Sequence, residues 1–241
     1  MVRRVGRGEV GRLTLGFVAS AANGPLPPLL RAFRERFLDV ELSLYEMNPR
    51  QSVDALQDKR IDAAFFYLPF GDVPPFEDPT LGYRPVSCEP LFVALPDGHP
   101  LAGQRQIELQ SLADEPFILV PRYQRAGLHD TVVELCRQAG FVPKVVQETY
   151  LVQTSVGLVA SGIGITLVPA SLRNLQTTGV VYRSVQGSTP TVQLGVVWRR
   201  DDPGVILNSF LRVVTEVLRD DQAIGEGKAV PPPSGAKRFA R

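Results

Sequence analysis

The chain has 241 residues, of which 44% are hydrophobic, and its 26 lysines and arginines nearly balance its 25 aspartates and glutamates. This composition is typical of a globular protein, and the near-neutral charge excludes a whole-chain argument for nucleic acid or a membrane surface as its partner. No apolar run is long enough to span a membrane, and the N-terminus lacks the apolar core of a signal peptide. We therefore expect a cytoplasmic protein without a membrane partner.

The first predicted unit is a strand that leads into a helix. Residues 13–18 form an apolar run long enough for one buried strand, and small residues follow from Ser20 to Gly24. Prolines that suit a first helical turn come next, and apolar residues then recur at helical spacing, at Leu26, Leu29, Leu30, Phe33 and Phe37. Ser20 therefore lies at a junction where backbone N–H groups and the helix dipole favour an anion. A second interpretation stays open, because serines at such junctions also cap helices.

The same alternation of strands and helices continues along the chain. A strand at 40–46, a helix after Asn48 and a strand at 61–67 complete a βαβαβ unit with a parallel sheet. A proline-rich loop at 69–79 separates this unit from a second set of elements. Further strands are predicted at 83–86, 90–95, 117–120, 142–146, 163–168, 180–185 and 192–199, and further helices at 128–139, 152–161 and 205–218.

This order predicts an α/β protein with two similar Rossmann-like subdomains. If the last helix packs on the first unit, the chain passes between the units twice, and two crossover strands form a hinge. We assign the chain to a linker remnant (1–11), subdomain I (12–86 with 190–219), subdomain II (87–189) and a disordered tail (220–241). Ligands in such folds bind beyond the carboxyl ends of the strands, in the crevice between the units.

Taken in this order, the segments resemble the effector-binding domain of LysR-type bacterial transcription regulators. The resemblance covers about residues 8–218 and rests on GRLTLG (11–16), LPPLLRAF (26–33), VELSLYE (40–46), IDAA (61–64), HPLA (99–102), EPFILV (115–120), Cys136 with AGF (139–141), and GLVASGIGITLVP (157–169). It implies a fold like that of type 2 periplasmic binding proteins. The subgroup that the chain is most similar to controls the breakdown of aromatic compounds and binds muconate- or benzoate-like carboxylates.

The resemblance also implies partners and a binding site. Such domains associate as homodimers or tetramers, and they reach promoter DNA through a winged helix-turn-helix that precedes them in full-length regulators and is missing from this sequence. The expected effector-binding residues are Ser20, Ala21, Pro49, Arg50, Gln51, Ser52, Tyr67, Pro121, Gly127, Leu128 and Val152. Pro49 stands where we expect a threonine. Tyr67 and Ser87 stand where some aromatic-responsive members have arginines, which argues against a second effector pocket.

Charged side chains in the cleft-side loops are further candidates. One of Arg50, Arg122 and Arg125 could pair with a carboxylate through its guanidinium fork, although for each of them exposure to solvent is the alternative. His129 opens a helix beside two of these arginines, and His99 lies in a polar turn. We expect both histidines to face solvent.

Other motifs argue against an enzyme or a metal site. Cys88 and Cys136 lack the spacing of a zinc site, so we expect no metal and no cofactor, and Cys136 fits a packed core thiol. Gly162-Ile163-Gly164 follows a helix and enters a strand, so it fits a helix C-cap with close packing rather than a dinucleotide site. A solute-binding receptor of the same fold and a small-molecule enzyme remain the alternatives. The missing export signal disfavours the first, and the lack of a positioned base and nucleophile disfavours the second.

Overall fold

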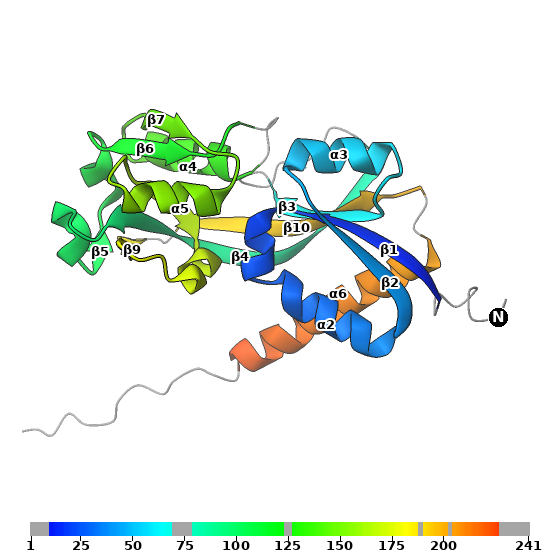
Figure 1. Ribbon diagram of the computed structural model, residues 1–241. Helices are drawn as coiled ribbons and strands as arrows, with labels where there is room; N and C mark the ends of the chain where they lie inside the picture. Colours follow the sequence, from blue (N-terminus) through cyan, green and yellow to red (C-terminus); the bar gives the residue numbers. More distant parts are fainter. Residues whose placement is uncertain (1–9, 69–78, 123–126, 188–189, 202–203, 227–241) are drawn as a thin grey trace, which may run out of the picture.

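The computed structural model describes residues 10–68, 79–122, 127–187, 190–201 and 204–226. It shows an α/β protein with two halves, joined by long strands through the middle of the molecule (Figure 1). One large mixed sheet has the strand order β2-β1-β3-β10-β4-β9-β5, with β8 also paired to β4, and a separate pair consists of β6 and β7. Within the described ranges, no helix is long and apolar enough to cross a membrane.

The first half has the predicted βαβαβ order. Its elements are β1 (Val10–Phe17), η1 (Ala19–Asn23), α2 (Leu26–Arg36), β2 (Asp39–Glu46), α3 (Pro49–Gln57) and β3 (Ala63–Tyr67). β1 pairs in parallel with both β2 and β3, as the alternation of strands and helices predicts. Side chains of β3 alternate between two cores, because successive residues of a strand point to opposite faces. Phe65 packs in the core below α2, and Phe66 packs with α3.

The second half contains the remaining parallel strands. Its elements, together with the strands and helix that return to the first half, are β4 (Leu81–Pro96), η2 (Pro100–Gly103), β5 (Gln106–Ile107), η3 (Leu109–Leu112), β6 (Pro116–Leu119), α4 (Leu128–Gln138), β7 (Lys144–Glu148), α5 (Val152–Ala160), β8 (Thr166–Pro169), η4 (Ala170–Leu175), β9 (Val180–Val185), β10 (Thr191–Arg199) and α6 (Val205–Glu226). β6 and β7 are parallel, and a single bridge joins Phe117 of β6 to Ile165, just before β8. The predicted second α/β unit is therefore present.

β4 and β10 are the two crossover strands. The first part of β4, from Leu81 to Pro90, pairs with β10, and the rest pairs with β8 and β9 of the second half. β10 continues the sheet to β3 of the first half. We predicted a β region over 83–86 and 90–95. The structure shows one strand of 16 residues there, with a register shift at Val86, the residue after Pro85.

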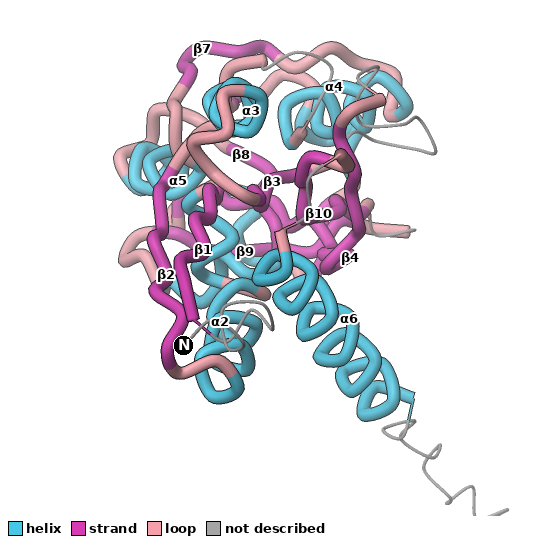
Figure 2. The backbone as a smooth tube through the Cα atoms, turned by 90° about the vertical axis from the view of Figure 1, so that its right-hand side faces the viewer, coloured by secondary structure: helices cyan, strands magenta, loops and turns pink. Residues whose placement is uncertain are grey.

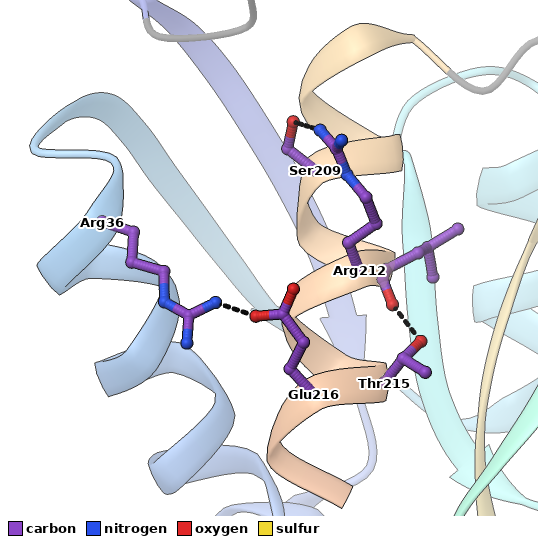
Figure 3. A network of polar contacts seen from close by, with 6 residues as sticks. Arg36, Ser209, Arg212, Thr215 and Glu216 are labelled. Atoms are coloured by element: carbon purple, nitrogen blue, oxygen red, sulfur yellow. Dashed lines mark hydrogen bonds and ion pairs between the residues drawn. The ribbon is translucent and has the colours of Figure 1, made fainter. Parts of the chain in front are cut away.

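The last helix packs on the first half, as the crossover requires. The ring of Phe210 on α6 packs edge-on against two rings of the first half. Its centroid lies 5.3 Å from that of Phe33 on α2 and 6.0 Å from that of Phe65 on β3. Figure 2 shows α6 running beside α2 and extending past the sheet. Polar contacts border this packing in Figure 3: Arg36 of α2 forms an ion pair with Glu216 of α6.

Two ends of the chain differ from the prediction. β1 begins at Val10, because Val10 already pairs with Asp39 of β2, so the linker remnant is shorter than 1–11. Residues 1–9 lie outside the described residues. α6 continues to Glu226 instead of ending at Leu218, since no glycine or proline interrupts residues 219–224. The predicted disordered tail therefore begins too early, and residues 227–241 lie outside the described ranges.

Two strands of the second half also begin later than predicted. β7 starts at Lys144 because Pro143 has no N–H to donate to the ladder. β8 starts at Thr166. Before it, Gly162 has a positive φ of 77° after α5, and a Cβ on Gly164 would lie 2.5 Å from the Pro116 carbonyl oxygen. This confirms the reading of the two glycines as a helix end with close packing.

A cysteine, an arginine and a histidine are buried or largely buried, and packing or polar contacts explain each of them. Cys136 is fully buried, as predicted from its place on the apolar face of α4. Arg199 is 8% exposed, and its Nη1 donates to the carbonyl oxygens of Leu56 and Ile61 at 2.7 Å each. Because Leu56 lies in the last turn of α3 and Ile61 follows the helix, the buried guanidinium stabilises the negative end of α3. We expected His99 to face solvent, and this prediction is wrong. Its side chain is only 11% exposed, because a Glu115 carboxylate oxygen lies 3.2 Å from its Nε2.

Candidate functional site

A cleft of about 320 Å³ lies where the carboxyl ends of five strands meet. Its lining comes from the segments that follow β1, β2 and β3 in the first half and β6 and β7 in the second half. This is the place at which parallel α/β folds bind ligands, because loops and helix N-termini converge there. The lining residues are Val18, Ala19, Ser20, Glu46, Met47, Asn48, Pro49, Gln51, Tyr67, Val120, Pro121, Gly127, Leu128, His129, Tyr150, Leu151, Val152 and Gln153.

The structure brings most of the sequence-predicted site residues together here. Eight of them line the cleft: Ser20, Pro49, Gln51, Tyr67, Pro121, Gly127, Leu128 and Val152. Three others, Ala21, Arg50 and Ser52, do not line it. Ala21 and Ser52 are buried in the protein interior, and Arg50 is exposed to solvent. The reason lies in helical geometry: neighbouring positions on the first turn of α3 point in different directions, so only some of them face the cleft.

Three helix N-termini open onto the cleft, and they differ in how they are capped. At α3, the Asn48 side chain accepts from the Gln51 N–H and the Gln51 side chain accepts from the Asn48 N–H, a reciprocal capping box. α4 follows Gly127 and α5 follows Leu151, and neither cap residue makes a side-chain cap hydrogen bond. The N–H groups in the first turns of α4 and α5 are therefore donors for an anionic ligand.

Ser20 lies in this lining without capping a helix. It is 3% exposed and sits inside the short helix η1, whose cap residue is Val18. The following helix α2 has Pro25 as its cap residue, and no side-chain hydrogen bond caps either helix. The capping interpretation of Ser20 is therefore wrong. Ser20 belongs to η1, and the rest of that short helix lies between it and α2. The small residues of this segment did not predict a separate five-residue helix.

A cluster of polar groups surrounds the inner side of Tyr67. Its hydroxyl is buried and makes no regular hydrogen bond with any described residue, although the Ser20 and Ser171 hydroxyls lie beside it. Burial raises the pKa of Tyr67 well above its usual value, the nearby Glu89 carboxylate raises it further, and the two serines oppose the shift. Tyr67 therefore stays protonated, with its hydroxyl buried beside those of Ser20 and Ser171.

Of the candidate side chains in the loops, His129 differs from expectation and Arg122 is exposed, as one of its two interpretations allowed. His129 is half-buried and lines the cleft instead of facing solvent, because its Nδ1 lies 2.8 Å from the Val120 carbonyl oxygen. Since a carbonyl can only accept, Nδ1 carries the proton and Nε2 is the acceptor of the neutral ring. Arg122 pairs with Asp130 at 2.8 Å and does not line the cleft. Arg125 lies outside the described residues.

The remaining lining residues were missed by the sequence reasoning. Most are immediate neighbours of predicted ones, such as Met47 and Asn48 before Pro49, or Leu151 and Gln153 around Val152. The signal that could have found them is their position at a strand end or in a helix's first turn. Within the described lining, Glu46 is the one carboxylate, and arginine and lysine do not occur. An anion in this cleft would therefore rely on backbone N–H groups and hydroxyls.

Comparison with known proteins agrees with this architecture. The chain matches the family model of the LysR substrate binding domain over residues 6–219. It is similar to the HTH-type transcriptional regulator CatR of Pseudomonas putida, with 36% identity over 89% of this chain and 71% of the relative. It is also similar to the HTH-type transcriptional regulator AlsR of Bacillus subtilis (strain 168), with 32% identity over 88% of this chain and 68% of the relative.

A solved structure extends the similarity to three dimensions. The BenM effector binding domain with its effector benzoate has a TM-score of 0.73 and 28% identity, and the match covers 95% of this chain and 99% of that chain. The fold in two halves, the cleft at the strand ends and the family match over residues 6–219 all agree. The chain therefore belongs to the family of LysR substrate-binding domains, the effector-binding part of LysR-type transcriptional regulators.

Proposed function

We propose that this domain senses a small aromatic or dienoic carboxylate in the cleft between its halves and thereby controls transcription in the cytoplasm. The observation that carries the proposal is the meeting of two uncapped helix N-termini, α4 and α5, with buried hydroxyl donors in one cleft. A volume of about 320 Å³ suits a small organic acid. The contacts that we propose are Ser20, Pro49, Gln51, Tyr67, Pro121, Gly127, Leu128 and Val152. The benzoate bound by BenM supports the ligand class.

Effector binding would be transmitted by movement of one half against the other. We propose subdomain I as residues 12–86 with 190–219 and subdomain II as residues 87–189. The lining of the cleft comes from both, so a ligand that contacts both sides binds the closed arrangement more tightly than the open one. β4 and β10 are the segments in which the change of angle would occur, because they run between the two units.

A thermal-shift screen over small carboxylates tests this function. A ligand present at about 100 times its Kd should add about 2.7 kcal/mol to the free energy of unfolding. Benzoate and 2,4-hexadienoate are the first probes, and the neutral amides of both acids are the matched controls. We expect the acids to stabilise the protein, the amides to have little effect, and the recovered acid to be chemically unchanged. Absence of stabilisation by any carboxylate would refute the proposal, and turnover of the acid would show an enzyme instead.

We further propose that the domain acts within a regulator that also carries a winged helix-turn-helix, and that two or four effector domains associate. The elements that the structure describes all belong to the effector-binding fold, so these 241 residues by themselves should bind DNA only weakly and non-specifically, with an affinity that falls steeply as salt increases. Mobility-shift titrations at two salt concentrations measure this, and a sequence-specific footprint would contradict it. Sedimentation equilibrium of the same protein measures the association, and a monomer at all concentrations would refute that part.

A further inference from the structure

Two side chains of the cleft lining carry a hydrogen-bond acceptor that no described residue uses. His129 is the second residue of α4 and Gln153 is the second residue of α5, so each lies in the first turn of one of the two uncapped helices. The function proposed above assigns a role to neither side chain. Its donors are the N–H groups of these same two turns, so acceptors and carboxylate-binding donors occur together at the cleft.

A single hydrogen bond fixes the tautomer of the His129 ring. Its Nδ1 lies 2.8 Å from the Val120 carbonyl oxygen, and this bond requires the proton on Nδ1. In the neutral ring, Nε2 then carries a lone pair and can only accept. No described residue donates to Nε2, and the neighbouring Asp130 carboxylate pairs with Arg122 instead. The half-buried ring therefore has an unused acceptor in the lining of the cleft.

The Gln153 amide is the second group without a partner. Its Oε1 is buried and forms no hydrogen bond with a described residue. A buried acceptor without a partner is unfavourable, and a ligand can supply the partner because Gln153 lines the cleft. A half-turn of the amide would exchange Oε1 for the NH2 group, and a hydroxyl satisfies either group because it both donates and accepts. A carboxylate only accepts, so it can satisfy neither Oε1 nor the Nε2 of His129.

We propose that the effector carries a hydroxyl group besides its carboxylate, and that His129 and Gln153 are the specificity-determining residues that select it. The carboxylate accepts from the N–H groups of α4 and α5, and the hydroxyl donates to an acceptor in the same two turns. Among the proposed ligands this favours hydroxylated aromatic acids, since a phenolic hydroxyl is a stronger donor than an alcohol. The inference rests on the proposed function, because it names the ligand class of the same cleft.

The test compares each monohydroxybenzoate with the fluorobenzoate that is substituted at the same ring position. Fluorine is similar in size to a hydroxyl group but cannot donate a hydrogen bond. Calorimetry on the wild-type chain at about pH 8, where an ordinary histidine is neutral, should give at least tenfold tighter binding of one hydroxybenzoate than of its fluoro counterpart. The affinity ratio of such a pair isolates the donor, because both acids have the same carboxylate and the same ring.

Two variants locate the group that accepts the hydroxyl. His129→Phe keeps a planar ring and removes Nε2, and Gln153→Leu keeps the size of the side chain and removes the amide. The affinity ratio should fall to within about twofold of one in at least one of these variants. It should keep its wild-type value in Gln104→Leu, the same change at an exposed residue outside the lining.

The outcomes separate this inference from the function on which it rests. If benzoate or 2,4-hexadienoate binds but no hydroxybenzoate binds more tightly than its fluoro counterpart, the inference is overturned and a carboxylate sensor remains. A ratio that persists in both cleft variants, or that falls equally in Gln104→Leu, overturns the assignment to His129 and Gln153. If none of these acids binds, the proposed function fails, and the inference fails with it. Because the first comparison uses the wild-type chain, it does not depend on how well the variants fold.

Discussion

Removal of the Ser20 hydroxyl should weaken effector binding with little loss of stability. Ser20 is 3% exposed, lines the cleft and caps neither η1 nor α2, and we expect its hydroxyl to contact the ligand. A hydrogen bond between neutral partners contributes about 0.5–1.5 kcal/mol, which corresponds to a roughly twofold to tenfold loss of affinity in Ser20→Ala. The free energy of unfolding should change by less than about 1 kcal/mol, since no helix cap is lost.

The chain offers a matched control in Ser52. This serine is fully buried and does not line the cleft, and its hydroxyl has no partner among the described residues. Removing an unsatisfied buried hydroxyl relieves a desolvation penalty, so Ser52→Ala should leave affinity unchanged and leave stability the same or higher. The two variants make the same chemical change at two buried sites, and only one of these sites faces the ligand.

Isothermal titration calorimetry with the best carboxylate from the screen measures both affinities, and urea unfolding measures both stabilities. Unchanged affinity in Ser20→Ala would remove this residue from the site. Equal losses in the two serine variants would show an indirect effect of packing rather than a ligand contact. A loss well above tenfold would indicate a charged partner for Ser20, because hydrogen bonds to charged groups contribute about 1.5–3 kcal/mol. That result would contradict the placement of the carboxylate at α4 and α5.

Four further predictions concern the fold. Gly164→Ala should lower the free energy of unfolding by about 1–3 kcal/mol, because its Cβ would lie 2.5 Å from a backbone oxygen. Gly157→Ala, at an exposed helical position with nothing within 4 Å of the added Cβ, should raise the same free energy by about 0.5–1 kcal/mol. Changes of the same sign for both variants in urea unfolding would contradict this. Arg199→Ala should cost about 2–5 kcal/mol by the same measurement, because two buried carbonyls lose their charged donor, and wild-type stability would show that water replaces it. In thiol labelling of the native chain at about pH 8, Cys88 should react and Cys136 should not, because Cys136 is buried and burial raises its pKa to about 12. Since the unfolded thiol ionises near 9, the buried thiol also predicts a loss of stability as pH rises from 9 toward 12.

The local elements were predictable because each rests on a short-range pattern. The alternation in β2 and the helical spacing of the apolar residues in α2 follow from periods of two and 3.6 residues, which need no knowledge of the rest of the chain. Contacts between segments decided what the local patterns could not show. β4 continues past two prolines because β10 pairs beside it. His99, which we expected to be exposed, is held in place by Glu115, 16 residues further along the chain.

The candidate site shows the same division. Ser20, Pro49, Gly127 and Val152 were found from the sequence because strand-to-helix junctions in α/β units converge at one edge of the sheet, whatever the details of packing. The direction of each side chain was not determined in this way. Arg50 and Ser52 share the first turn of α3 with Gln51, and yet only Gln51 faces the cleft, since the rotation of the helix depends on what packs beneath it.

The class of fold, the order of its elements and the edge of the sheet that holds the candidate cleft were predictable from the sequence alone. These properties depend on hydrophobic period, on turn residues and on the rule that parallel strands need crossover connections. Tertiary packing, in contrast, explains why Ser20 caps no helix and why the Tyr67 hydroxyl is buried beside the hydroxyls of Ser20 and Ser171. Such facts arise from strand register and packing between residues far apart in the chain, and short-range patterns carry no information about either.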